Sequence, residues 1–144
     1  RAPEGSKGQG HYVDGPRKSF AGGAGLLSTA RDYARFLEAI RLGGALDGVR
    51  ILSRRAVDLM TTNQVGTLHS ATGLGFGFGF ETVDRYGAKS MDGVGAFGWG
   101  GAYGSFYRVD PQAQLVMVLM IQLMPNGTDI SDRFPTLVYQ AFGQ

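Results

Sequence analysis

The chain has 144 residues, of which 43% are hydrophobic and 18% are charged, and its formal net charge is +2. This length is enough for one domain with a core of its own. So small a charge, with no run of Lys or Arg, argues against nucleic acid or an anionic membrane as a partner. Because the sequence has no cysteine, disulfides and thiolate metal sites are excluded, while the redox compartment stays open.

The sequence shows neither a signal peptide nor a membrane span. Its longest apolar run, 115–123, is far too short to cross a bilayer and predicts a buried strand. Periplasm and cytoplasm both remain possible locations. The chain begins at Arg1 without Met, and residues 1–20 are rich in Gly, Pro and charge. This composition predicts a loop or linker cut from something longer.

Two helices are predicted in the first half. Thr29 and Asp32 have the spacing of a capping box, and apolar residues then recur at helical spacing as far as Ile40. The pair Gly43-Gly44 predicts the end of this helix. Ser53 is the predicted N-cap of a second helix over residues 54–62.

From Gly73 onward the hydrophobic period changes to two. Residues 73–80 predict a strand whose aromatic face, with Phe76, Phe78 and Phe80, lies in the core. Residues 84–97 predict a loop.

Residues 99–110 alternate again and predict a second strand. The turn sequence 110–113 then leads into a third strand, 115–123, antiparallel to its predecessor. Asn126-Gly127 predicts a further turn. A last helix is predicted over 131–142, with Pro135 in its first turn, where Pro is tolerated.

This order of elements predicts an α+β fold, with helices packed against one antiparallel sheet. Three apolar strands alone would leave edges and a face of the sheet uncovered. We therefore expect residues 21–144 to be the C-terminal part of a domain that an N-terminal portion completes.

Three stretches together resemble one known family. They are residues 24–36 (A-G-L-L-S-T-A-R-D-Y-A-R-F), 73–78 (G-L-G-F-G-F) and 98–105 (G-W-G-G-A-Y-G-S), which runs on to Val109-Asp110-Pro111. Their succession resembles the C-terminal portion of the group formed by class C β-lactamases, penicillin-binding proteins and family VIII carboxylesterases. The resemblance implies a β-lactamase-like (DD-peptidase/transpeptidase-like) fold and a serine hydrolase that works through an acyl-enzyme without a cofactor.

The resemblance also implies the residues of a site. The family's third motif, K-T-G or in some members H-x-G or W-G-G, aligns with Trp99-Gly100-Gly101. The backbone N–H of Ala102 would then stabilise the oxyanion of the tetrahedral intermediate. Substrate would be bound by Trp99, Gly100, Gly101 and Tyr103. A Lys at the first motif position can pair with a substrate carboxylate, whereas Trp cannot, which favours neutral esters over lactams.

The family's first two motifs, S-x-x-K and Y-x-N, are not found in this sequence. No Ser is followed by Lys at the third position, and no Tyr is followed by Asn at the second. Since S-x-x-K supplies the nucleophile in the family, we expect the chain alone to be inactive. Its expected partners are an N-terminal part carrying S-x-x-K and a small ester or lactam substrate.

Two alternatives stay open. The chain could be a non-catalytic module that binds a peptide or a partner through the same strand, or a fragment without independent function. Trp99, the only tryptophan, could also be a core residue. His11 and His69 are each isolated in a predicted loop, so no metal site is expected.

Overall fold

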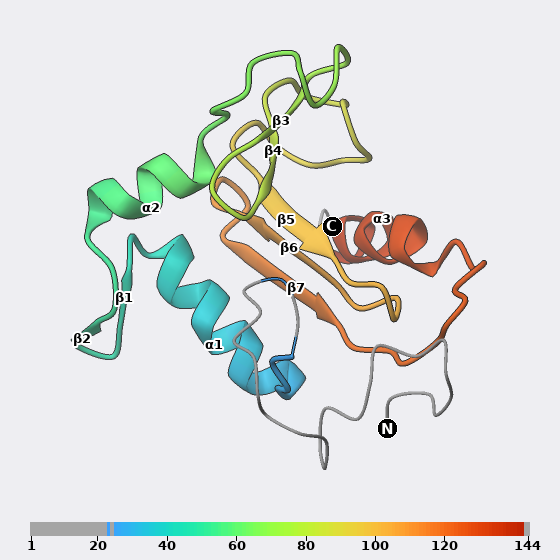
Figure 1. The fold of residues 1–144 in the computed structure, drawn as a ribbon, viewed down its shortest axis with the longest axis horizontal. Coiled ribbons are helices and arrows are strands. Elements are labelled where there is room, and N and C mark those ends of the chain that lie inside the picture. The colour runs from blue at the N-terminus through green and yellow to red at the C-terminus, as the bar shows by residue number, and fades with distance from the viewer. Residues whose placement is uncertain (1–22, 24, 143–144) are drawn as a thin grey trace.

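The computed structural model describes residue 23 and residues 25–142, so the linker predicted at 1–20 lies outside the described residues. The helices and strands combine as the sequence predicts, in an α+β fold (Figure 1). In chain order they are α1 (Ala30–Arg41), β1 (Ala45–Leu46), β2 (Val49–Arg50), α2 (Arg54–Thr61), β3 (Leu74–Phe76), β4 (Glu81–Val83), β5 (Phe97–Gly100), β6 (Phe106–Asp110), β7 (Leu115–Leu119) and α3 (Ile130–Phe142).

The two N-caps predicted for α1 and α2 are confirmed. The Thr29 hydroxyl accepts a hydrogen bond from the N–H of Asp32 at 3.1 Å and donates one to its carboxylate at 2.9 Å. The Ser53 hydroxyl accepts a hydrogen bond from the N–H of Ala56 at 3.1 Å. Caps of this kind stabilise a helix by about 1 kcal/mol each. Between the two helices lies the short hairpin of β1 and β2, which the sequence analysis did not predict.

The main sheet has five antiparallel strands in the order β3-β4-β5-β6-β7, rather than the three predicted. The difference arises because β4 was not predicted and because one predicted strand is folded back into a hairpin. The predicted strand 73–80 covers only β3 and the tight turn after it, and β4 begins beyond it at Glu81. At this turn the N–H of Gly77 donates to the carbonyl of Phe80 at 2.8 Å, and Gly79 has a φ of +89°. Phe78 therefore lies at the tip of a turn and is 58% exposed, so its predicted place in the core is wrong, whereas Phe80 is buried.

The predicted strand 99–110 is two strands, β5 and β6, joined by a turn over residues 101–105. Alternation of small and aromatic residues continues through this turn, so the sequence period alone did not reveal it. The third predicted strand is confirmed as β7, although it ends at Leu119. Pro135 is the sixth residue of α3, since the helix begins at Ile130, so its predicted place in the first turn is wrong.

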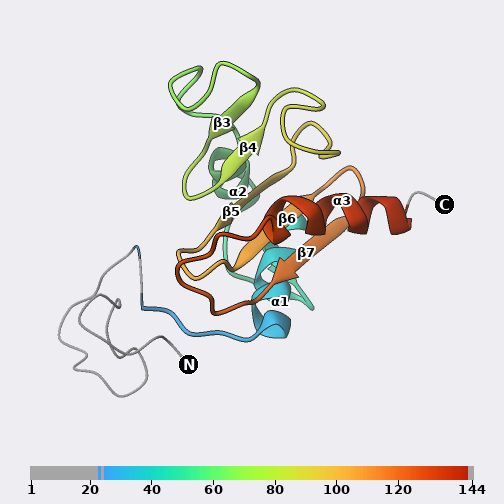
Figure 2. The ribbon, with the colours of Figure 1, turned by 90° about the vertical axis from the view of Figure 1, so that its right-hand side faces the viewer.

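Helices cover both faces of the sheet, with α1 on one side and α3 on the other (Figures 1 and 2). On the α1 side, the ring of Tyr33 packs edge-on against Tyr107 of β6, with the centroids 5.2 Å apart. On the α3 side, the hydroxyl of Tyr139 donates a hydrogen bond to Asp110 Oδ2 at 2.7 Å. The buried core lies between α1, α2 and the sheet and consists of Leu37, Ile40, Val57, Phe80, Phe97 and Val109.

No helix within the described residues has the length and apolarity needed to cross a membrane.

Candidate functional site

The W-G-G segment lies where β5 runs past the end of its neighbour β4. Strand β6 pairs with β5 along its whole length, including Trp99 with Tyr107 and Gly100 with Phe106. Strand β4, in contrast, pairs with β5 only at Phe97 and Gly98. Beyond Gly98, the edge of β5 that faces β4 has no partner strand in the described part of the chain. An open strand edge presents backbone donors and acceptors to a ligand.

A cavity of about 440 Å³ lies beside this open segment. Trp99, Gly100, Gly101 and Ala102 all line it, so the structure brings together four of the five residues that the sequence singled out. The side chain of Trp99 is 43% exposed, which places it at the rim and not in the core. The charged side chains on the cavity wall belong to Lys89 and Asp132.

The turn after β5 fixes the direction of the backbone at Ala102. The N–H of Gly101 donates to the carbonyl of Ser105 at 2.7 Å, and the N–H of Gly104 donates to the carbonyl of Gly101 at 2.9 Å. Gly104 has a φ of +84°, a conformation that favours glycine. No described residue accepts a hydrogen bond from the N–H of Ala102. That N–H, on an exposed residue at the cavity wall, is therefore available to a ligand.

Tyr103, the fifth predicted site residue, is not among the residues that line this cavity. It is half-buried, and its carbonyl accepts a hydrogen bond from the N–H of Leu123 at 3.0 Å. Its predicted role in substrate binding stays a prediction. Ser105 does line the cavity, but its hydroxyl donates to the carbonyl of Ile121 at 3.1 Å.

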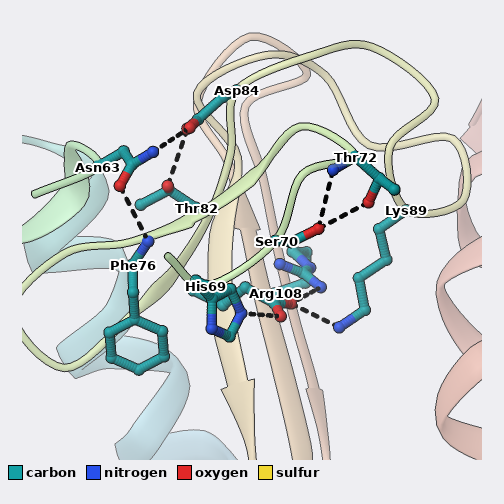
Figure 3. Close-up of polar contacts among 10 residues, drawn as sticks. Asn63, His69, Ser70, Thr72, Phe76, Thr82, Asp84, Lys89 and Arg108 are labelled. Carbon is teal, nitrogen blue, oxygen red and sulfur yellow. Dashed lines mark hydrogen bonds and ion pairs between the residues drawn. The ribbon is translucent and has the colours of Figure 1, made fainter. Parts of the chain in front are cut away.

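Next to the W-G-G strand lies a cluster of charges centred on Glu81, which is 6% exposed. Lys89 Nζ lies 2.5 Å from Glu81 Oε1, and Arg108 Nη2 lies 3.5 Å from the same oxygen. His69 Nε2 lies 3.1 Å from Glu81 Oε2. Figure 3 shows His69 and Lys89 reaching this carboxylate from opposite sides. A carboxylate only accepts hydrogen bonds, so His69 Nε2 carries the proton in this contact.

Gly98 lets the cluster form across the sheet. Glu81 of β4 and Arg108 of β6 both pair with Gly98, which lies between them in β5. A Cβ atom at Gly98 would collide with the backbone carbonyl of Tyr107. On the far side, Arg108 Nε lies 3.3 Å from Asp92 Oδ2, and both of these side chains are 1% exposed. Glycine at position 98 thus leaves room for the backbone of β6 and for the ion pair between Glu81 and Arg108 on either side.

The electrostatics of the cluster differ between its two carboxylates. Burial alone would raise the pKa of Glu81, but hydrogen bonds from Lys89 and His69, together with the charges of Lys89 and Arg108, outweigh burial and hold the pKa below its usual value of 4.5. Burial raises the pKa of Asp92 above its usual value, and the charge of Arg108 only partly offsets this effect. Of the two carboxylates, Glu81 is therefore better stabilised as an anion than Asp92.

Two aromatic rings pack against Trp99, which lines the cavity. Phe76 packs edge-on against Trp99, with the ring centroids 4.9 Å apart at an interplanar angle of 90°. The His69 ring lies 5.2 Å from Phe76 and 6.3 Å from Trp99. All three separations lie within the range of favourable aromatic contacts. Trp99, the first residue of the W-G-G motif, is thus contacted by Phe76 of β3 and by His69 of the loop before β3.

Sequence reasoning did not identify His69, Glu81 and Lys89 as parts of one cluster. The view of His69 as isolated is wrong, since it bonds to Glu81 and contacts two rings. No local signal could have revealed this cluster, because its members come from separate loops and strands. Within the described residues, no three His, Cys, Asp or Glu side chains are grouped so as to hold a metal ion.

Comparison with known proteins decides the family. The family model described as Beta-lactamase matches residues 1–140. The chain belongs to the beta-lactamase family. This beta-lactamase-family chain is 40% identical over 128 residues to Protein Rv1367c of Mycobacterium tuberculosis (strain ATCC 25618 / H37Rv), a match that covers 80% of this chain and 32% of the relative. It is 32% identical over 110 residues to Esterase EstB of Burkholderia gladioli, covering 74% of this chain and 27% of EstB.

Among solved structures, the beta-lactamase-family chain is similar to EstCE1, described as a hydrolase with promiscuous acyltransferase activity. The TM-score is 0.63 at 30% sequence identity, and the match covers 80% of this chain and 29% of EstCE1. The resemblance read from the sequence and the α+β fold are therefore both confirmed. The chain spans about a third of the length of the curated relatives that it matches.

Proposed function

We propose that the chain is the C-terminal part of a serine hydrolase that cleaves neutral esters through an acyl-enzyme. In this proposal, an N-terminal part carrying S-x-x-K supplies the nucleophile and its base. This chain supplies the W-G-G strand, and the N–H of Ala102 is one donor of the oxyanion hole. The observation that carries the proposal is the N–H of Ala102, which has no acceptor among the described residues and lies on the wall of a cavity that Trp99, Gly100 and Gly101 also line.

The chemistry of acyl transfer explains why such a segment matters. When the serine attacks, the carbonyl oxygen of the substrate becomes negative, and preorganised N–H groups stabilise it by about 3 to 4 kcal/mol per donor. A backbone donor needs no particular side chain, so Ala at position 102 is compatible with the role. Gly100 and Gly101 add no side chain that would keep a substrate away from the strand.

Trp99 supports the preference for esters over β-lactams. It is the first residue of the open segment of β5, and it offers an apolar face and one N–H donor without a charge. Lys89 also lines the cavity, but its ammonium is already paired with the carboxylate of Glu81. The names of EstB and EstCE1 agree with ester chemistry, as they describe an esterase and a hydrolase with acyltransferase activity.

The first test is intact-mass spectrometry of the native purified protein, before and after a fluorophosphonate probe that labels activated serines. We expect the probe's mass on a polypeptide that is joined to this chain or copurifies with it. Hydrolysis of p-nitrophenyl esters, without hydrolysis of a chromogenic cephalosporin, would support the ester preference. A single unlabelled species near 15.4 kDa, with no ester turnover, would overturn the proposal and favour a binding module.

The role of Ala102 has its own test in the active protein. Ala102→Pro removes the N–H, and we expect kcat to fall by about 10²- to 10³-fold. Ala102→Gly keeps the N–H and is the matched control, with kcat expected within about threefold of wild type. Equal activity of the proline and glycine variants, both shown to be folded by circular dichroism, would refute the assignment.

A further inference from the structure

We infer that His69 is a positioning residue that holds the indole of Trp99 in place by linking it to the buried charge cluster of Glu81. The effect of His69 on substrate binding rests on the proposed function, whereas the contacts of His69 with Trp99 and Glu81 do not. His69 contacts the Trp99 ring on one side and the Glu81 carboxylate on the other. It thereby connects the rim of the cavity with a fixed point inside the sheet.

The fixed point is well defined, because Glu81 is held from three directions. Its Oε1 atom is shared by Lys89 and Arg108, which leaves Oε2 for His69. Arg108 is itself 1% exposed and paired with Asp92. The acceptor of the His69 bond, Glu81 of β4, is therefore paired with a buried residue of β6. A hydrogen bond to a buried charged group is among the stronger polar contacts in a protein.

The segment that carries His69 has no regular structure and is held by a backbone hydrogen bond from Gln64 to Phe76 and by side-chain contacts. At one end, Asn63 donates to Asp84 Oδ2 at 2.5 Å and accepts from the N–H of Phe76 (Figure 3). Further along, His69 turns inward to the sheet, while its neighbour Leu68 is 90% exposed. His69 is thus the inward anchor of this loop next to Trp99.

Trp99 depends on these neighbours because its indole lies at the partly open edge of the sheet. Tyr107 of β6 is its cross-strand partner on one side, whereas β4 has no residue paired with it on the other. In the described part of the chain, its ring contacts are with Phe76 and His69. Since the indole is 43% exposed, loss of one of these two contacts would let it move into solvent or into the cavity.

The arrangement predicts how His69 affects substrate selection. An indole that is already fixed loses little rotamer freedom when a flat apolar group of the substrate packs against it. His69 would therefore act on substrate binding and not on the chemical step. In the active protein, we expect His69→Ala to raise KM for an aromatic ester by about threefold to tenfold. We expect kcat to stay within about twofold of wild type.

The decisive experiment uses fluorescence and does not need turnover. Trp99 is the only tryptophan of the chain. With every tryptophan of the N-terminal part replaced by Phe, fluorescence anisotropy and quenching by acrylamide report on this indole alone. His69→Ala removes both the ring and the hydrogen bond, and we expect about a twofold larger quenching constant and a lower anisotropy. Leu68→Ala, at the exposed neighbouring position, is the control and should match wild type.

Two further variants separate the ring from the hydrogen bond. His69→Gln can still donate to Glu81 but has no ring, and His69→Phe keeps a ring but cannot donate. Each is expected to show at least about half of the quenching increase of His69→Ala, because both contacts are needed to hold the indole. Full restoration by His69→Gln would overturn the inference, since His69 would then only tether the loop.

The fold of each variant is checked by far-ultraviolet circular dichroism before its fluorescence is read. If His69→Ala does not fold, the Gln and Phe variants carry the test, and each is then expected to show a larger quenching constant than wild type. Wild-type quenching in folded His69 variants would overturn the inference and leave the proposed esterase untouched. Changed fluorescence in a protein that hydrolyses no ester would support the positioning role of His69 and count against the proposed function alone.

Discussion

The buried carboxylate of Glu81 allows the sharpest test of the described structure. Glu81→Gln keeps the shape of the side chain and removes its charge. The variant leaves Arg108 buried with Asp92 as its remaining counter-ion and weakens the bonds from Lys89 and His69. Removing one partner of a buried ion pair costs about 3 to 5 kcal/mol. Because Lys89 is 38% exposed and can turn to water, we expect the lower end, about 3 kcal/mol of unfolding free energy at pH 7.

The assay is urea denaturation followed by far-ultraviolet circular dichroism, with wild type and variant compared at fixed pH. Lys89→Met is the matched control on the exposed side of the cluster, and its expected loss is about 1 kcal/mol. A loss below about 1 kcal/mol for Glu81→Gln at pH 7 would refute the reasoning. It would mean that the carboxylate is solvated, or that the three contacts are not formed.

The pKa of Glu81 also predicts how the difference in unfolding free energy between wild type and Glu81→Gln changes with pH. The pKa of Glu81 in the folded protein lies below 4.5, its ordinary value. A carboxylate with a lowered pKa stabilises the fold above its unfolded pKa, and this stabilisation is lost as the pH falls through the folded value. The difference between wild type and Glu81→Gln should therefore be constant above about pH 5 and shrink below 4.5. The pKa of Asp92 is shifted in the opposite direction, but Asp92 is present in both proteins, so its contribution largely cancels from the difference in stability.

Two other predictions concern the strand and α3. Gly98→Ala should lower the unfolding free energy by roughly 2 to 4 kcal/mol in urea denaturation, because its Cβ would collide with the carbonyl of Tyr107. Gly127→Ala, where a Cβ meets nothing within 4 Å, should change stability by less than about 0.5 kcal/mol; similar losses in both variants would contradict the packing at Gly98. Tyr139→Phe removes the hydrogen bond to Asp110 and should cost about 1 kcal/mol. It should also raise the pKa of Asp110, which this bond helps to hold below its usual value against the effect of burial; an unchanged carboxyl titration by NMR would refute that contact.

The sequence by itself determined the three helices and where the first two of them begin. Thr29 and Ser53 precede apolar residues at helical spacing, and a cap acts within one turn, so local information is sufficient. It also determined the family, because the three motifs survive as a linear order of residues. For the same reason it placed Trp99, Gly100, Gly101 and Ala102 together, since neighbours along one strand remain neighbours in space.

Only the tertiary structure decided how many strands there are and what surrounds the motif. Alternation of small and aromatic residues has the same period in a strand as in the turn that follows it, so the pattern did not reveal the turn at the end of 73–80 or the turn within 99–110. The contacts of Glu81 with His69, Lys89 and Arg108 join separate segments through the pairing of β4, β5 and β6. Such contacts depend on strand register, and register is set by packing of the whole sheet and not by any local run of residues.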